Sequence, residues 1–148
     1  MLKRLFLVAI LAVAVVFAYG CGEAENGEET VEPVEPIEIK EEEIPEEIRA
    51  WIEDSRDQFG GRARVHNGLL YILVTYGEKP TGGYVVEIED IEKQGDTLVV
   101  TAEFTEPGED DIVTQALTYP YDLAVVEETE LPVDFVAAGD EDEIPVLE

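Results

Sequence analysis

The sequence has very few of the side chains that carry most nucleophilic and metal chemistry. Its 148 residues include one cysteine (Cys21), one serine (Ser55) and one histidine (His66). His/Cys zinc sites are therefore excluded for lack of ligands, and an internal disulfide cannot form. A serine triad would require Ser55 on a helix to meet His66 beside a turn, with no surrounding motif to shape a nucleophile. We therefore expect no catalytic residues, no metal site and no cofactor. The protein is not expected to be an enzyme.

Basic residues are also scarce. Nine Lys and Arg stand against 36 Asp and Glu, which gives a formal net charge of −27. Such a charge repels phosphate backbones, so nucleic-acid binding is excluded. With so many acids, paired carboxylates carry no information about catalysis. The acidic segment 106–111 could offer oxygen ligands to Ca²⁺, but it lacks an ordered alternation of ligands and is interpreted as a hydrated hairpin loop.

The N-terminus has the pattern of an export signal. Lys3 and Arg4 precede an uncharged apolar run over residues 5–18, and Ala18-Tyr19-Gly20 leads directly into Cys21. This pattern resembles a bacterial lipoprotein precursor. The resemblance implies cleavage after residue 20, acylation of Cys21, and lipid anchoring on the extracytoplasmic side of the cell membrane or outer membrane. A plain signal peptide or an uncleaved anchor, with Cys21 incidental, is the alternative.

The next segment, residues 21–43, is predicted to be a disordered linker. Residues 22–43 hold ten glutamates, two prolines and one basic residue, Lys40. A chain of this composition cannot bury enough apolar surface to offset its conformational entropy. As a charge-extended spacer it would reach on the order of 25 Å or more. Order is expected to begin near Ile44, so the folded domain is placed at residues 44–138, with a frayed acidic tail at 139–148.

The folded domain is predicted to open with a single helix. Pro45 followed by Glu46 and Glu47 is typical of a helix start, because the fixed φ and the negative charges suit the first turn. Gly60-Gly61 is predicted to end the helix. Trp51 is interpreted as a core anchor that docks the helix on a sheet. The apolar residues of the predicted helix recur at roughly helical spacing and would form its buried face: Ile48, Trp51, Ile52 and, less regularly, Phe59.

From residue 62 the apolar period changes to that of strands. Asn67-Gly68 predicts a two-residue hairpin turn, and residues 69–74 are apolar on both faces, as in a strand covered on each side. Pro120 marks a bend or an edge. The pattern predicts an antiparallel β-sandwich or barrel-like domain of six to seven strands with one N-terminal helix. The predicted strands cover residues 63–66, 69–75, 84–91, 97–104, 112–119, 121–127 and 133–137.

The most specific segment is the connection Lys79-Pro80-Thr81-Gly82-Gly83-Tyr84. Adjacent glycines permit φ > 0 and leave the loop tip bare, so the backbone of another protein could approach closely. Lys79 would be an isolated positive charge in a negative field. The partner-binding surface is hypothesised to be this loop, flanked by Tyr119-Pro120-Tyr121. A tight connection between strands, without a binding role, is the alternative interpretation.

At this segment the chain resembles the PrcB C-terminal domain family. The matching blocks are residues 77–88, 98–100 and 114–121, within a likeness that spans roughly residues 69–128. The resemblance implies a secreted or lipid-anchored accessory module of a surface protease complex, with no catalytic residues to carry over. We therefore predict a membrane-anchored extracytoplasmic protein-interaction module that assists or stabilises a secreted protease complex.

A weaker likeness connects the same loop to chagasin-type inhibitors of papain-like cysteine proteases. Those inhibitors insert a loop of the form Asn-Pro-Thr-Thr-Gly-Tyr into the protease cleft. Pro80, Thr81, Gly83 and Tyr84 stand in matching places, whereas the chain departs from the pattern at the other two positions of residues 79–84. Protease inhibition through residues 79–84 is therefore the alternative function.

Overall fold

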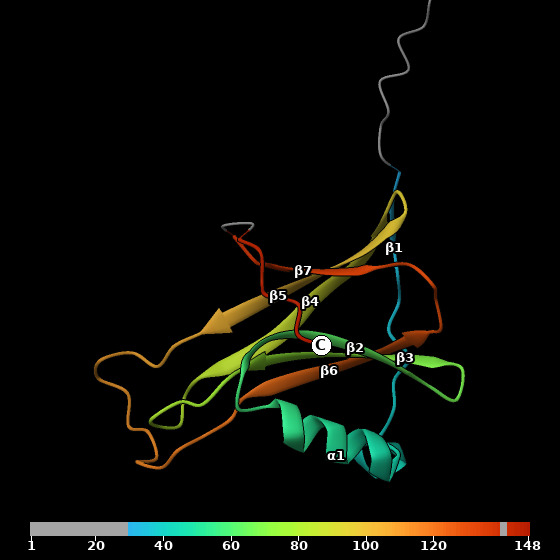
Figure 1. Ribbon diagram of the computed structural model, residues 1–148. Helices are drawn as coiled ribbons and strands as arrows, with labels where there is room; N and C mark the ends of the chain where they lie inside the picture. The colour runs from blue at the N-terminus through green and yellow to red at the C-terminus, as the bar shows by residue number, and fades with distance from the viewer. Residues whose placement is uncertain (1–29, 140–141) are drawn as a thin grey trace, which may run out of the picture.

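The computed structural model of the chain describes residues 30–139 and 142–148, and these form a mainly β structure with one α-helix (Figure 1). The predicted signal sequence and Cys21 lie outside the described residues. A short 3₁₀ turn, η1, precedes the helix. The elements in chain order are β1 Val31–Pro33, η1 Glu41–Glu43, α1 Glu46–Ser55, β2 Phe59–His66, β3 Leu69–Tyr76, β4 Val85–Gln94, β5 Thr97–Thr105, β6 Tyr121–Glu127 and β7 Val133–Ala137.

The strands form two sheets. One sheet has the order β2-β3-β6 and is antiparallel throughout. The other has the order β1-β4-β5-β7, and its β5–β7 pair is parallel. The prediction of a wholly antiparallel fold was therefore wrong at β7, which follows a crossover from the other sheet. The strands of the described residues do not close into a barrel, whereas the predicted strand number and the N-terminal helix are confirmed.

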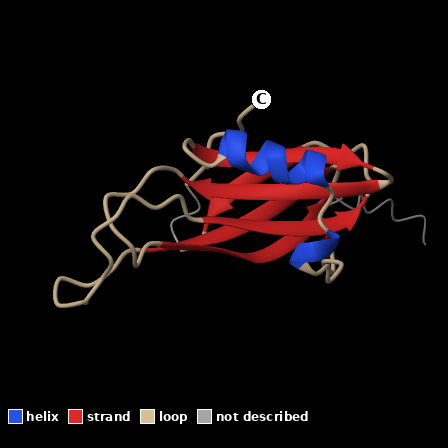
Figure 2. Ribbon diagram, turned by 90° about the horizontal axis from the view of Figure 1, so that it is seen from below, coloured by secondary structure: helices blue, strands red, loops and turns tan. Residues whose placement is uncertain are grey.

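The elements lie in three layers, with the two sheets facing each other and α1 on the outer face of β2-β3-β6 (Figures 1 and 2). The main core lies between the sheets and contains Leu70, Ile72 and Val74 of β3. The opposite side of β3 supplies Tyr71 and Leu73 to a second cluster under the helix. The prediction of a strand covered on each side is thus confirmed. Trp51 is half-buried against the second cluster.

The β2–β3 hairpin turns at Asn67-Gly68, as predicted. Asn67 has φ 52° and Gly68 has φ 78°, the two positive values that a type I′ turn requires. β4 contains a register shift between Ile88 and Asp90. This bulge changes which side chains face the core, so Val86 and Ile91 are both buried although they are five positions apart, an odd spacing that places residues of a regular strand on opposite faces.

The helix ends earlier than predicted. It stops at Ser55, and the two glycines that were expected to end it lie within β2. Gly61 faces the buried ring of Phe135, where a Cβ atom would lie 2.3 Å from the Phe135 Cγ atom. Phe59 belongs to β2 rather than to the apolar face of the helix, and its ring packs 5.4 Å from that of Phe104. Close packing between sheets, and not helix termination, explains Gly61.

Part of the predicted linker belongs to the fold. β1 pairs with β4 from Val31↔Gln94 to Pro33↔Glu92. Beyond β1, the Val34 amide donates to the Ile91 carbonyl (2.8 Å), and the Ile37 amide donates to the Val125 carbonyl (2.7 Å). The prediction of disorder was therefore wrong for residues 31–43, which run from one sheet to the other before they enter α1.

Two further expectations near the C-terminus were wrong. Residues 112–119 do not form a strand but belong to a long connection between β5 and β6. The acidic end is not frayed over residues 142–148, because Ile144 is 3% exposed in the main core. Its amide donates to the Phe135 carbonyl, and the Leu147 amide donates to the Gly61 carbonyl, each at 2.9 Å.

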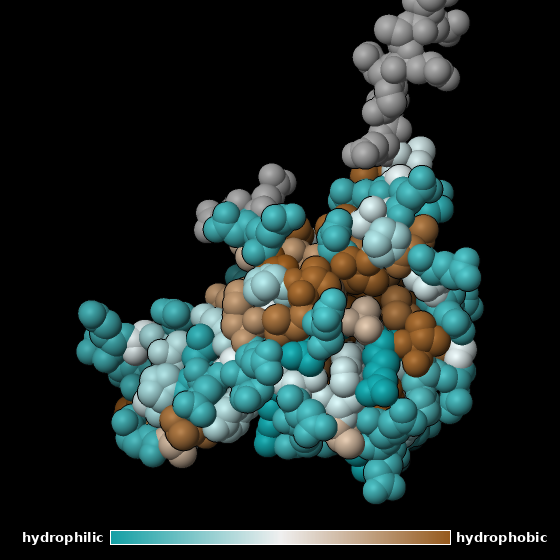
Figure 3. All heavy atoms as spheres, viewed as in Figure 1, coloured by the Kyte–Doolittle hydropathy of each residue, from teal (hydrophilic) through white to brown (hydrophobic). Residues whose placement is uncertain are grey.

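On the face seen in Figure 3, apolar residues gather across the middle, over β7 and the adjoining strands.

Candidate functional site

Two loops lie together at one end of the sheets, and we call them the end loops: residues 77–84, between β3 and β4, and residues 106–120, between β5 and β6 (Figure 1, left). Lys79 and Thr118 exchange both backbone hydrogen bonds, at 2.9 and 3.0 Å. The Thr118 hydroxyl donates to the Thr81 carbonyl (2.7 Å), and the Gly82 amide donates to the Thr114 carbonyl (2.8 Å). The structure thus joins residues 79–82 to residues 114–118, which directly precede the predicted flanking residues 119–121.

The two adjacent glycines of residues 77–84 have different surroundings. Gly83 has φ 87°, and a Cβ atom there would lie 2.8 Å from Pro107 Cβ and Val113 Cγ1. Gly82 has no such constraint, because its nearest contact would be Thr114 at 3.5 Å, an ordinary van der Waals distance. Gly83 is therefore required by the packing of one end loop against the other, whereas Gly82 leaves room for a side chain.

The side chain of Lys79 contacts aromatic rings of its own domain. Its Nζ atom lies 3.6 Å from the ring centroid of Tyr76 and 5.3 Å from that of Tyr84. The two rings meet edge to face at 5.8 Å, and Tyr76 also packs at 4.8 Å against Phe104. Burial, followed by the nearby carboxylate of Glu106, raises the pKa of Tyr76. The cation and the rings therefore brace the base of residues 77–84, so Lys79 contributes to the structure of the loop itself.

The predicted flanking residues lie beside the same loop. The Tyr119 hydroxyl donates to Glu78 Oε2 at 2.8 Å, and this hydrogen bond is the main reason why the pKa of Tyr119 is raised. The guanidinium of Arg56 stands 5.4 Å from the centre of the Tyr119 ring. The Pro120 carbonyl accepts from the Tyr76 amide (2.9 Å). Tyr121 is 41% exposed, so it is the most accessible aromatic of this group.

Sequence reasoning identified residues 106–111 as a loop but did not extend the loop through residues 112–118. Ile112 is 103% exposed and Leu117 is 59% exposed, although both were assigned to a strand over residues 112–119. The available signal was the run Glu106-Pro107-Gly108, which breaks a strand, followed by three more acids before Ile112. Connections of about 15 residues without regular structure are uncommon in small domains and often bind partners. Residues 106–120 are therefore part of the candidate site.

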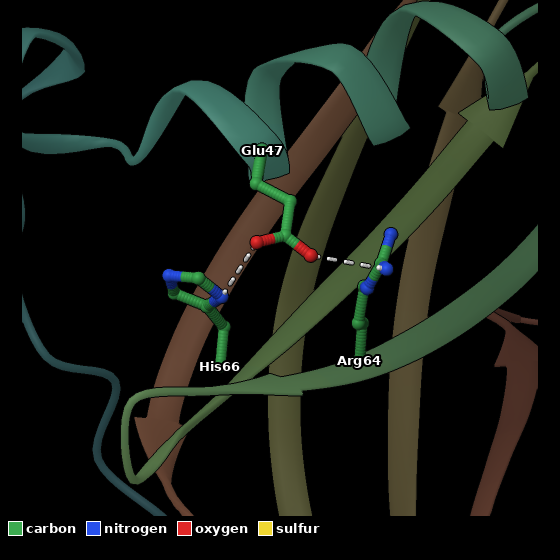
Figure 4. Close-up of polar contacts among 3 residues, drawn as sticks. All are labelled: Glu47, Arg64 and His66. Carbon is green, nitrogen blue, oxygen red and sulfur yellow. Dashed lines mark hydrogen bonds and ion pairs between the residues drawn. The ribbon is translucent and has the colours of Figure 1, made fainter.

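The single serine and histidine do not form a catalytic pair. The Ser55 hydroxyl is buried and donates to the Trp51 carbonyl of its own helix at 2.6 Å. His66 Nδ1 lies 3.6 Å from Glu47 Oε2, and Arg64 lies 3.4 Å from the other oxygen of this carboxylate (Figure 4). His66 is the last residue of β2, where it is half-buried and faces α1. The contacts of Glu47 link the helix to β2.

The other candidate was a cation site in the acidic segment 106–111. The Gly108 amide donates to Asp111 Oδ2 (2.7 Å), and the Asp111 amide donates to the Gly108 carbonyl (3.1 Å). This carboxylate caps a turn. Across residues 30–139 and 142–148, acids, histidines and cysteines form no group of three that could hold a metal ion. Within the same ranges, no helix has the length and apolar character needed to cross a membrane.

Comparison with known proteins identifies the family of the central segment. Residues 70–127 match the family described as PrcB C-terminal. This range runs from β3 to β6 and contains both end loops. No curated protein and no solved structure matches the chain. The match confirms the resemblance seen in the sequence motifs: residues 70–127 are similar to the PrcB C-terminal family.

Proposed function

We propose that the chain is a membrane-anchored, extracytoplasmic module that binds a protein partner through its end loops and assists a secreted protease complex. The observation that carries this proposal is that one family-matched segment, residues 70–127, contains both end loops and the two strands, β3 and β6, that hold them in place. The family name supports an accessory role in a protease complex. Lipid attachment at Cys21 remains the expectation from the sequence.

The construction of the end loops suits protein binding. Four backbone or hydroxyl hydrogen bonds join residues 79–82 to residues 114–118, and the Lys79 cation lies over two aromatic rings. Loops that are held in one arrangement before binding lose less conformational entropy when a partner docks. Pro80 and Gly83 are exposed at the turn of residues 77–84. A partner can therefore reach the backbone there without unfolding the loop.

The position of the N-terminal segment also supports the proposal. β1 pairs with β4 at Gln94, whereas residues 77–84 enter β4 at its other end, Val85. Ten residues of extended strand separate these points by about 30 Å. A chain anchored through residues that precede β1 would thus present the end loops away from the lipid, at the far end of the domain.

The test is capture of a partner by the intact lipoprotein and by two tryptophan variants. Pro80→Trp places a bulky ring on the exposed turn, with no backbone amide to lose. Val65→Trp is the matched control, because Val65 is 45% exposed on β2 next to the hairpin turn at residues 67–68. We expect crosslinking in native membranes to recover a protease with the intact chain and with Val65→Trp but not with Pro80→Trp. Equal recovery by all three chains would contradict the proposed surface.

The alternative function, chagasin-like inhibition, would use the same residues 79–84. An assay of the activity of the recovered protease distinguishes it from the accessory role. An accessory subunit preserves or raises the activity of the recovered protease over time, whereas an inhibitor lowers it stoichiometrically. The bracing of residues 79–82 along residues 114–118 favours the accessory role, because the loop does not project alone from the sheet.

A further inference from the structure

The most exposed large apolar side chain of the described residues is that of Ile112, in the second end loop. Its exposed fraction is 103%, so it gains nothing from the fold of its own chain. In Figure 1 the orange connection that contains it projects beyond the ends of the strands. Burial of a fully exposed isoleucine in a partner's pocket releases its entire apolar surface from water. The side chain is therefore available as an anchor for binding.

The backbone around Ile112 is held on both sides. On its N-terminal side, Gly108 and Asp111 are joined by two hydrogen bonds, at 2.7 and 3.1 Å. On its C-terminal side, Val113 packs where the Cβ atom of Gly83 would stand, and the Thr114 carbonyl accepts from the other end loop. An exposed side chain on a constrained backbone is typical of a preorganised contact.

Carboxylates surround this position in sequence without basic residues to neutralise them. Glu106, Glu109, Asp110 and Asp111 are all exposed. The sequence has no lysine, arginine or histidine from residue 94 to its last residue. The lysine of the neighbouring loop has its ammonium group over the aromatic rings described above. The tip of the loop is thus an apolar side chain within a negative field.

We propose that Ile112 inserts into an apolar pocket on the protein partner, and that this pocket is rimmed by lysine and arginine side chains. This inference rests on the proposed function and specifies the chemistry of the partner. Complementary charge steers such an encounter and fixes its orientation, while the apolar contact slows dissociation. Insertion of the same tip into a lipid bilayer is disfavoured, because Asp110 and Asp111 would be carried toward the hydrocarbon and repelled by anionic head groups.

The first arm of the test is quantitative recovery of the partner captured by the full-length lipoprotein. Ile112→Ser is expected to lower recovery by about 10- to 100-fold, the equivalent of losing one fully buried aliphatic side chain. The double variant Glu109→Gln/Asp110→Asn is expected to slow association and to weaken its dependence on salt. Its matched control is Glu128→Gln/Glu130→Gln, which removes the same charge from the exposed connection between β6 and β7.

The second arm locates the contact. A photoreactive benzoylphenylalanine replaces Ile112 in one chain and Val65 in another, and both chains are irradiated in native membranes and with phosphatidylcholine–phosphatidylglycerol vesicles. We expect residue 112 to crosslink to a peptide of the partner that lines an apolar pocket bordered by lysine or arginine. Attachment to lipid, attachment to a peptide without basic neighbours, or the same product from residue 65 would overturn the inference.

The two proposals fail differently. If Pro80→Trp abolishes capture but Ile112→Ser and the charge variant leave it unchanged, the end loops bind a partner by another contact and this inference is wrong. If the intact chain recovers no protein, both proposals are wrong. Unfolding of the Ile112→Ser variant is not expected, because a fully exposed side chain contributes no packing, and circular dichroism checks this directly.

Discussion

Gly61 is the position where adding one methyl group should cost the domain the most. A Cβ atom at Gly61 would lie 2.3 to 2.5 Å from three ring atoms of Phe135, more than 1 Å inside ordinary contact distance. Phe135 is 1% exposed and lies in the main core, so its ring cannot move into solvent. We therefore expect Gly61→Ala to lower the free energy of unfolding by about 3 kcal/mol, at the upper end of overpacking costs.

Urea unfolding measures this effect. With an m-value of about 1.5 kcal/mol/M, a loss of about 3 kcal/mol lowers the midpoint by about 2 M. Gly82→Ala is the matched control and should stay within about 0.5 kcal/mol of the parent, because its new Cβ atom meets Thr114 at 3.5 Å.

A double-mutant cycle tests the cause. Phe135→Leu makes room next to residue 61, so it should recover at least about 1 kcal/mol in the Gly61→Ala background relative to additivity. If Gly61→Ala proves as stable as the parent, or if the two changes simply add, the close contact between β2 and β7 is not what requires glycine at this position.

Two further predictions concern a carboxylate that connects the two sheets and a tyrosine at the base of the end loops. Asp122 accepts from the amides of Ile88 (2.8 Å) and Leu123 (2.9 Å), which belong to different sheets. Asp122→Ala should therefore cost about 2 kcal/mol and speed hydrogen exchange at the Ile88 amide, and Asp122→Asn about half as much; equal exchange in the two variants would contradict this. The folded pKa of Tyr76 is raised above 10, so the stability that its neutral phenol contributes is complete below pH 10 and is lost as the pH rises through the folded value. Tyr76→Phe should flatten this alkaline fall in the urea midpoint; an unchanged profile would assign the fall to other groups.

Local patterns in the sequence predicted the parts of the fold that depend on neighbouring residues. Asn67-Gly68 specified the β2–β3 hairpin because few other residue pairs adopt two positive φ values. Leu98, Val100 and Ala102 alternate along the predicted strand 97–104, and these are the residues of β5 that are buried. In these cases the residues that determine the structure lie within one or two strands of each other. The parallel β5–β7 pair could not be read in this way, because it joins segments separated by the whole of β6.

The N-terminal segment shows why composition alone misled the prediction. Its glutamates favour disorder, but Val31, Val34 and Ile39 recur among them, and their partners lie far along the chain. Val34 packs against the main core and Ile39 against the cluster under the helix. A few apolar side chains with a prepared surface to cover are sufficient to order a segment that is acidic overall. That surface exists only after β4 and β6 have formed.

The prediction for residues 112–119 failed for a related reason. Apolar residues recur there as they do in a strand, but the loop's hydrogen bonds go to residues 79–82 rather than to a neighbouring strand. The sequence identified the first end loop through its proline and glycines, and it named Tyr119–Tyr121 as flanking residues. It gave no sign that residues 106–120 brace that loop, because the contact joins segments about 35 residues apart.

The contacts of the end loops separate residues that build the surface from those free to meet a partner. Lys79 stacks on tyrosine rings, and Gly83 is fitted against Pro107 and Val113. Substitution at either position should therefore change stability and binding together, since the loop itself is altered. Ile112 contributes nothing to the fold, so Ile112→Ser should change binding without changing the unfolding midpoint. This difference makes Ile112 the cleaner test of function, although the motif that resembles the family lies in the first end loop.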